Sequence, residues 1–120
     1  MRILIVDDSK AMRSIVRRTM TQIGFADHAF EEACNGAEAL ALIRQSPPGL
    51  TIADWNMPQM SGIELLKALR QEGSTIKFGF VTSEGTPEMK QEALAAGAAF
   101  FLSKPFSNEM LREVLLPVLT

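Results

Sequence analysis

Four short hydrophobic runs divide this chain, and they lack the regular polar alternation of a sheet with one face in water. They cover residues 3–6, 50–53, 78–81 and 100–102. Runs of this kind are typical of parallel strands that are covered on both faces. A weaker run at residues 29–33 includes Glu31 and Glu32, and two charges suit a strand at the edge of a sheet. The pattern therefore predicts five strands.

The segments between these runs have the spacing of amphipathic helices. After the first strand, apolar residues recur every three or four positions as far as Gly24, and Arg13, Arg17 and Arg18 are expected on other faces of that helix. The other helices are expected from about residues 37, 61, 87 and 107. Pro117 is expected to fray or end the last helix, because proline lacks the N–H that an inner helical turn requires.

Strands that alternate with helices predict right-handed crossovers and an α/β fold. We expect a doubly wound (βα)5 fold, which is an open parallel five-stranded sheet with helices on both faces. The flavodoxin-like strand order 2-1-3-4-5 places the charged strand at an edge and strands one and three at the centre. In such sheets, ligands bind outside the carboxyl ends of the strands.

Composition limits the classes of protein to which the chain can belong. Its 120 residues, 47% hydrophobic and 22% charged, fit one globular domain over residues 1–120 without a linker or repeat. A net charge of −2 gives no reason to expect nucleic-acid binding, and no apolar stretch approaches the roughly 20 residues of a membrane span. A single cysteine, Cys34, excludes an internal disulfide and fits a cytoplasmic protein. We interpret Cys34 as structural.

Functional side chains follow four of the predicted strands. Asp7 and Asp8 follow the first strand, Asp54 follows the third, Thr82 follows the fourth, and Lys104 comes soon after the fifth. Because the carboxyl ends of parallel strands share one edge, all five side chains are expected to gather there. The lysine is two strands from the third strand, roughly 10 Å, which its long side chain can span.

Three carboxylates this close repel one another, and a divalent cation would relieve the repulsion. An oxygen-only site suits Mg²⁺, or Mn²⁺ as a substitute, and no histidine or cysteine joins these acids to favour zinc. The alternative is that the acids only cap loops and pair with Lys104. Together with the ammonium and hydroxyl groups, the cation would cradle a phosphoryl group whose phosphorus Asp54 attacks.

The motifs at this edge resemble the receiver domain of two-component response regulators. The resemblance is carried by Val6-Asp7-Asp8-Ser9, Asp54-Trp55-Asn56-Met57-Pro58 with Gly62, Val81-Thr82-Ser83 and Lys104-Pro105-Phe106. These blocks cover the whole chain in register, and the first two are most similar to the stand-alone chemotaxis-type (CheY-like) regulators. Because the sequence shows no DNA-binding or enzymatic output region, we expect a single receiver domain with no output domain.

The resemblance also implies roles in phosphorylation. Asp54 is the phosphoacceptor, and the donor is a phosphohistidine on a sensor histidine kinase. Asp8, Asp54 and the backbone carbonyl of Asn56 bind Mg²⁺, and Asp7 helps through water. Asn56 and Glu84 tune how readily water removes the phosphoryl group. The chain would then be no conventional enzyme, because it catalyses only its own phosphorylation and dephosphorylation.

In this family, the modification is read as a conformational switch. Thr82 and Lys104 bind the phosphoryl group, the Thr82 hydroxyl moves inward, and Phe101 swings into the vacated space. Tyrosine is common at the position of Phe101, and this chain has no tyrosine, so the readout would rely on ring packing. A cis Lys104–Pro105 peptide would orient the lysine. We expect a monomer that binds its target, in chemotaxis or motility, through helix four, strand five and helix five.

Several other functions stay open on the sequence. A small Mg²⁺-dependent phosphohydrolase that resembles the haloacid dehalogenase family would require a second acidic residue at the position of Asn56. A flavodoxin-like protein would need amides and hydroxyls to bind a flavin phosphate at the loop where Asp7 and Asp8 lie. A phosphotransfer intermediate would use the same chemistry as the receiver domain. An inert receiver-like interaction module would not need intact Asp54 and Lys104.

Overall fold

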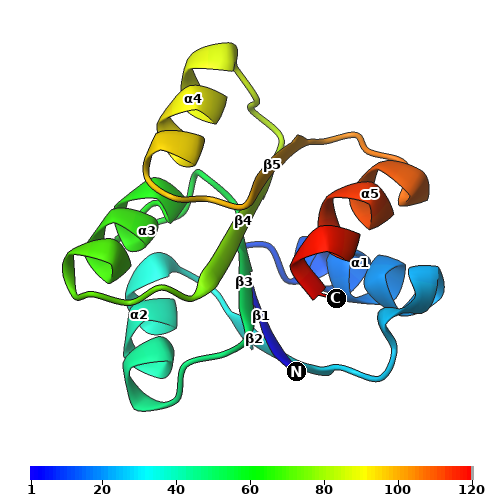
Figure 1. Ribbon diagram of the computed structural model, residues 1–120, viewed down its shortest axis with the longest axis horizontal. Coiled ribbons are helices and arrows are strands. Elements are labelled where there is room, and N and C mark those ends of the chain that lie inside the picture. Colours follow the sequence, from blue (N-terminus) through cyan, green and yellow to red (C-terminus); the bar gives the residue numbers. More distant parts are fainter. Residues whose placement is uncertain (120) are drawn as a thin grey trace.

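Five parallel strands form the central layer of the computed structural model, which describes residues 1–119 (Figure 1). The strands are β1 (Arg2–Val6), β2 (Ala29–Ala33), β3 (Leu50–Ala53), β4 (Lys77–Thr82) and β5 (Phe100–Ser103). Their order is β2-β1-β3-β4-β5, and every neighbouring pair is parallel. The predicted doubly wound sheet, with its strand order, is confirmed.

Helices cover both faces of the sheet. They are α1 (Lys10–Met20), α2 (Gly36–Gln45), α3 (Gly62–Gln71), α4 (Pro87–Ala95) and α5 (Asn108–Leu119). Figure 1 shows α2, α3 and α4 on one side and α1 and α5 on the other. No helix among residues 1–119 is both long enough and apolar enough to span a bilayer.

Each helix begins where a side-chain oxygen accepts a hydrogen bond from a backbone N–H of the first turn. The five capping residues are Ser9, Asn35, Ser61, Thr86 and Ser107. At α3 the bond is reciprocal, because the Glu64 carboxylate accepts from the Ser61 N–H at 3.1 Å. Loss of one such cap costs typically about 1 kcal/mol. These caps therefore fix where the five helices begin.

The core consists of two layers, one on each face of the sheet. Successive residues of a strand point to opposite faces, so β1 supplies Leu4 to the layer beneath α2, α3 and α4, and Ile5 to the layer beneath α1 and α5. Phe80 and Leu111 are fully buried members of the two layers. Burial on both faces is the physical reason for the continuous hydrophobic runs.

Two helix ends differ from expectation. The first helix does not continue regularly to Gly24: α1 ends at Met20, and a wider π-helical turn, η1 (Thr21–Phe25), follows. Gly24 has a φ of 111° in this turn, a conformation that glycine adopts readily. Gly24 therefore does end the helical segment, as expected, but it does so in the irregular turn that follows α1.

The expectation that Pro117 frays or ends the last helix is wrong, because α5 continues to Leu119. Proline lacks only its own N–H, so α5 loses one helical hydrogen bond at this position and the bonds of its other residues remain. Val118 is buried in the core, and its carbonyl accepts a hydrogen bond from the Lys77 ammonium group at 2.6 Å. Core packing and this cation therefore hold the final turn in place.

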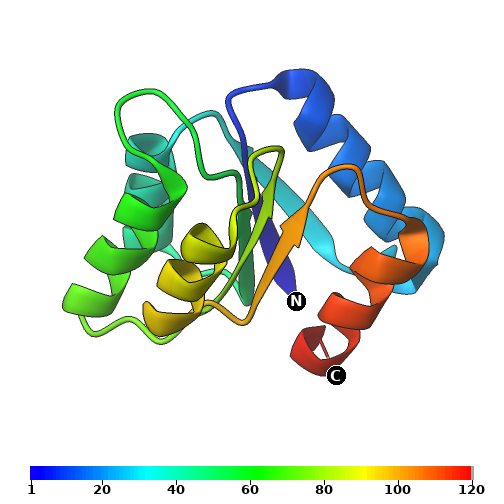
Figure 2. The ribbon, with the colours of Figure 1, turned by 90° about the horizontal axis from the view of Figure 1, so that it is seen from above.

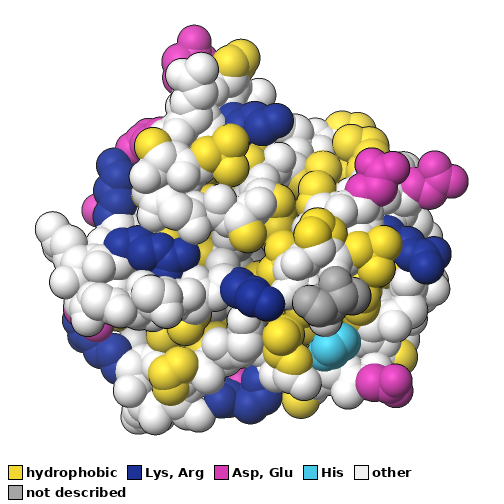
Figure 3. All heavy atoms as spheres, in the orientation of Figure 1, with side chains coloured by type: hydrophobic (Ala, Val, Ile, Leu, Met, Phe, Trp, Pro, Cys, Tyr) yellow, Lys and Arg dark blue, Asp and Glu magenta, His cyan; other side chains and the backbone are white. Residues whose placement is uncertain are grey.

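The carboxyl ends of all five strands lie at one edge of the sheet. Figure 2 shows the loops that follow the strands together along the top of the molecule. The opposite face carries the amino ends of the strands. There, positive and negative side chains are interspersed among hydrophobic ones, without a large region of one sign (Figure 3).

Thr51 is a buried polar residue in the middle of β3. Its side chain is 0% exposed, and its hydroxyl has no hydrogen-bond partner within residues 1–119. We expect Thr51→Val to raise the free energy of unfolding by about 1 kcal/mol, because it removes a buried, unpaired hydroxyl at little change in volume. Urea unfolding of the purified variant measures this.

The matched control is Thr21→Val, because the Thr21 hydroxyl is at the surface and donates to the Arg17 carbonyl. Its effect on the free energy of unfolding should stay within about 0.5 kcal/mol. A clear loss of stability in Thr51→Val would show that the buried hydroxyl does have a partner.

Candidate functional site

Three carboxylates meet at the carboxyl edge because β1 and β3 are neighbours in register. Val6 pairs with Ala53, and the next N–H along, that of Asp54, donates to the Val6 carbonyl at 2.9 Å. Each of Asp7, Asp8 and Asp54 offers an oxygen, and these oxygens all lie within 4.8 Å of one another. The predicted acidic cluster is therefore present, and it comes from two separate parts of the chain.

Asp7 is the buried member of the cluster, with 5% of its surface exposed. Burial raises the pKa of its carboxyl group above the ordinary value. The Ser9 N–H, which donates to Asp7 Oδ1 at 2.9 Å, and the positive charge of Lys104 offset part of this effect on the pKa. Asp8 is exposed and Asp54 is half-buried, so these two carboxylates face the space in which a ligand would bind.

Lys104 reaches this cluster from β5, as the sequence predicted. Its ammonium nitrogen lies 3.5 Å from Asp7 Oδ2, and its backbone N–H donates to the Thr82 carbonyl at 2.7 Å. The Lys104–Pro105 peptide is cis, which the resemblance implied. The carboxylate that pairs with Lys104 is thus that of Asp7, which follows β1. The strand β1 is one strand farther from β5 than β3, which carries Asp54.

Thr82 ends β4 and is completely buried. Its hydroxyl oxygen accepts a hydrogen bond from the Glu84 N–H at 3.3 Å. Glu84 and Asn56 themselves are exposed in the loops that follow β4 and β3. The structure therefore brings the threonine into the packed edge and leaves the two expected tuning residues in contact with solvent.

Gly62 lets the start of α3 approach the loop that carries Asp54. Its N–H donates to the Trp55 carbonyl at 2.9 Å. A Cβ atom at this position would lie only 2.2 Å from the Asp54 carbonyl oxygen, so any other residue would force the backbone apart. The glycine thus fixes the position of Asp54 relative to α3.

Three aromatic rings pack together behind the acidic cluster. The Trp55 ring lies 5.1 Å from the Phe80 ring and 6.0 Å from the Phe101 ring, the second pair in an edge-on arrangement. Phe101 is half-buried and also contacts Phe80, with 6.1 Å between ring centroids. Phe101 thus rests against the residue that directly follows Asp54.

The donor set fits a hard divalent cation. The cluster contains only carboxylate oxygens, which Mg²⁺ and Mn²⁺ prefer, and neither His28 nor Cys34 belongs to it. Without a cation, three negative groups within 4.8 Å are balanced chiefly by one lysine. The chemistry of these residues thus agrees with the Mg²⁺ site expected from the sequence.

Arg13 and Glu32 are neighbours of the site that sequence reasoning missed. Arg13 was expected to point away from the core, but its side chain is only 14% exposed. It donates to the Asp7 carbonyl at 2.6 Å and to the Glu32 carboxylate at 2.8 Å. A helical projection gave a usable signal, because Arg13 lies one turn before the buried Val16 and so beside the apolar stripe.

Comparison with known proteins agrees with this geometry. The model of the response regulator receiver domain family matches residues 3–116. The chain belongs to this family. A chemotaxis protein CheY homolog of Campylobacter jejuni is 39% identical to it over 122 residues, which cover 99% of this chain and 92% of that protein.

Solved structures of other receiver domains have the same fold. The chemotaxis response regulator CheY4 of Vibrio cholerae superposes with a TM-score of 0.84 at 38% identity, and the match covers 98% of both chains. A DNA-binding response regulator of the LuxR family from Staphylococcus aureus superposes with a TM-score of 0.86 at 27% identity, over 98% of this chain and 97% of that one. The acidic cluster of this receiver domain occupies the edge at which such folds bind ligands.

Cys34 lies at the same edge of the receiver domain, just after β2. Its thiol donates a hydrogen bond to the Glu38 carboxylate at 3.1 Å, and this contact raises the pKa of the thiol above its ordinary value. Because the thiolate is the reactive form, a raised pKa lowers reactivity near neutral pH. This agrees with our interpretation of Cys34 as structural.

We expect Glu38→Gln to lower the pKa of Cys34 and to speed its alkylation by iodoacetamide at pH 8. The substitution leaves the backbone N–H of residue 38 bonded to the Asn35 side chain, so the helix cap is kept. The glutamine side chain removes the negative charge beside the thiol. The rate of alkylation as a function of pH, measured by mass spectrometry, checks this. An unchanged or slower rate would show that Glu38 does not control the thiol.

Proposed function

We propose that this receiver domain accepts a phosphoryl group on Asp54 from a phosphohistidine of a sensor histidine kinase. It would act as a response regulator in chemotaxis or motility signalling. The cluster of Asp7, Asp8 and Asp54 with Lys104 is the observation that carries the proposal. The relatives named as chemotaxis proteins support the choice of pathway.

In the proposed reaction, an oxygen of the Asp54 carboxylate attacks phosphorus in line with the bond to the donor. An O–P bond forms, the P–N bond breaks, and its electron pair leaves with the imidazole nitrogen. Asp8, Asp54 and the Asn56 carbonyl would hold Mg²⁺, or Mn²⁺ in its place, with Asp7 acting through water. When bound, the cation supplies charge neutralisation for the phosphoryl oxygens and for the attacking carboxylate.

Lys104 and Thr82 would bind the other phosphoryl oxygens. The lysine pairs with Asp7 at 3.5 Å, a long contact that the ammonium group can leave for a stronger anion beside Asp54. The Thr82 hydroxyl accepts from the Glu84 N–H, so its own proton is free to be donated. Both residues thus offer donors to a dianion on Asp54, and they would stabilise the transfer by position and charge.

The same contacts would convert phosphorylation into a change of surface. A dianion on Asp54 draws the Thr82 hydroxyl towards it, and the neighbouring Phe101 repacks against Trp55 and Phe80. Phe101 also lines a surface pocket of about 450 Å³ together with Thr86, Lys90, Leu102, Ser103 and Met110. This pocket lies between α4, β5 and α5, so a target that binds there would detect the position of the ring.

The modification would be transient. Asn56 and Glu84 are exposed at the rim of the site, so water can reach an acyl phosphate on Asp54. Hydrolysis in the same cradle returns the carboxylate, and the chain then catalyses only its own phosphorylation and dephosphorylation. A phosphohydrolase with a separate substrate has less support, because Asn56 occupies the position at which such an enzyme needs a second acid.

We also propose that this receiver domain is active as a cytoplasmic monomer and that it signals by docking to a target protein. An inert interaction module has no need to keep Lys104 within 3.5 Å of a buried acid. A phosphotransfer intermediate would use the same residues, and its next partner would be a second histidine instead of a docked target.

We expect Asp54→Asn to abolish labelling by a radioactive small phosphodonor, such as acetyl phosphate, in the presence of Mg²⁺. The asparagine has nearly the same shape but no nucleophilic carboxylate. Asp7→Asn is the matched control, because it also removes one acidic charge from the cluster. It should slow labelling by about tenfold without abolishing it, since Asp7 acts only indirectly on the cation.

The label should be lost both in acid and in base, as an acyl phosphate requires. Filter binding after each treatment, with circular dichroism to verify folding, measures these outcomes. Equal labelling of the wild type and Asp54→Asn would show that the acceptor lies elsewhere.

A further inference from the structure

The Arg13 side chain links α1 to the loop that carries two of the three clustered acids. Its guanidinium group donates through Nη1 to the Asp7 carbonyl at 2.6 Å and through Nε to Glu32 Oε1 at 2.8 Å. The side chain is only 14% exposed, which is unusual for arginine and indicates a defined position. The Arg13 side chain reaches the backbone of the acidic loop and leaves the carboxylates themselves free.

The carbonyl that Arg13 binds belongs to the peptide group that joins Asp7 to Asp8. The preceding peptide group, which joins Val6 to Asp7, is held by β2, because the Asp7 N–H donates to the Ala33 carbonyl at 3.1 Å. Arg13 therefore restrains the rotation of the one peptide group whose orientation sets the directions of both side chains. Asp8 is exposed, so its placement depends on the backbone that carries it.

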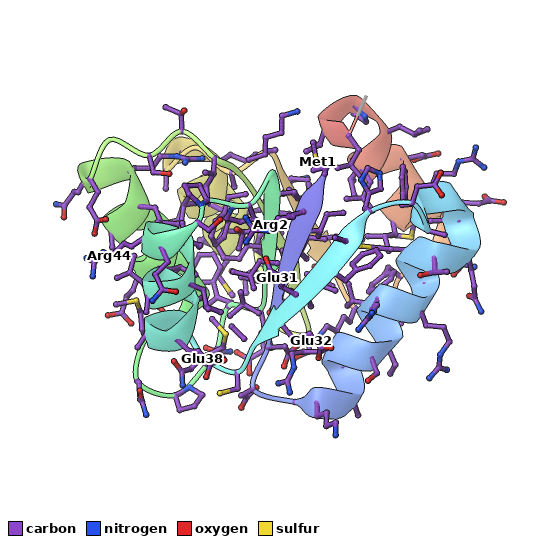
Figure 4. The ribbon with its side chains drawn as sticks, turned by 90° about the horizontal axis from the view of Figure 1, so that it is seen from below. Met1, Arg2, Glu31, Glu32, Glu38 and Arg44 are labelled. Atoms are coloured by element: carbon purple, nitrogen blue, oxygen red, sulfur yellow. The ribbon has the colours of Figure 1, made fainter. Side chains whose placement is uncertain are left out.

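Glu32 holds the guanidinium group in the required orientation. Figure 4 shows Glu32 on β2, on the side of the strand that faces α1 and the loop before it. Its second carboxylate oxygen lies 3.6 Å from Arg17 Nη1, so Glu32 accepts a hydrogen bond from Arg13 and forms a longer ion pair with Arg17 of the same helix. A planar guanidinium group with several donors can bind a carboxylate and a carbonyl at once, which an ammonium group does less well.

We propose that Arg13, oriented by Glu32, is a positioning residue for the divalent cation site formed by Asp7, Asp8 and Asp54. This inference rests on the proposed function, because it assumes that the cluster binds Mg²⁺. Arg13 does not touch the cation in this account. It fixes the peptide group between Asp7, which acts through water, and the ligand Asp8, as outer hydrogen-bonding partners do at other metal sites.

Whether removal of Arg13 raises or lowers the Mg²⁺ affinity distinguishes a positioning role from a purely electrostatic one. Arg13 is a cation beside three carboxylates, so removal of its charge alone would strengthen the attraction of the cluster for Mg²⁺. Loss of positioning has the opposite effect, because misaligned ligands bind the cation more weakly. A weaker affinity after removal of Arg13 can therefore be attributed to geometry.

The experiment measures the Mg²⁺ dissociation constant from the fluorescence of Trp55, which is the only tryptophan and directly follows Asp54. We expect Arg13→Met to raise this constant by about tenfold at a temperature well below unfolding. Arg17→Met is the matched control on the same helix. It removes a contact with Glu32 and one with the Phe30 ring but none with Asp7, so the constant should change less than about twofold.

Two further variants keep the charge constant. Arg13→Lys retains the positive charge, and Arg13→Met combined with Glu32→Gln removes one charge of each sign. Both should raise the dissociation constant, the double variant by about as much as Arg13→Met. A measurement without metal completes the set: hydrogen exchange of the Asp7 and Asp8 amides should be faster in Arg13→Met than in Arg17→Met.

An unchanged or lower dissociation constant in folded Arg13→Met would overturn the proposal, and a lower one would assign Arg13 a purely electrostatic role. An equal rise in Arg17→Met would overturn it as well, because the effect would then reflect general loosening of α1. A wild-type protein without a Mg²⁺ response would refute the proposed function first, and the inference about Arg13 would fail with it.

Discussion

Repulsion among three carboxylates is the constraint on which the rest of this site depends. Parallel pairing of β1 with β3 places Asp7, Asp8 and Asp54 so that one oxygen of each lies within 4.8 Å of the others. Such a cluster is costly unless positive charge balances it. The chain itself supplies the ammonium group of Lys104, which contacts only the buried member of the cluster. The remaining negative charge faces outward, where the donor set fits a divalent cation.

Much of the fold follows from local patterns. The hydrophobic runs predicted the strands because a parallel sheet buries both faces, and the spacing of apolar residues predicted the helices because each helix buries one of its faces. The gathering of Asp7, Asp54, Thr82 and Lys104 at one edge also followed, because parallel strands end together. These predictions needed only the order of the elements along the chain.

Features that depend on contacts between distant side chains were not predictable in the same way. The sequence does not show that Lys104 pairs with Asp7, since several acids lie within its reach. Arg13 was assigned to the wrong environment because its partners, the Asp7 carbonyl and Glu32, become neighbours only after β1, β2 and α1 pack together. Pro117 was judged by its local cost alone, whereas burial of Val118 outweighs that cost. In each case, tertiary packing decided between local alternatives.

The most direct test of the account is to locate the cation. Crystals grown or soaked with Mn²⁺ allow its position to be found from anomalous scattering, independently of any activity. We expect one strong peak per chain, within coordination distance of carboxylate oxygens of Asp8 and Asp54 and absent from crystals of Asp54→Ala soaked in the same way. A map without a peak between these acids at saturating Mn²⁺, or with its main peak elsewhere on the molecule, would contradict the account.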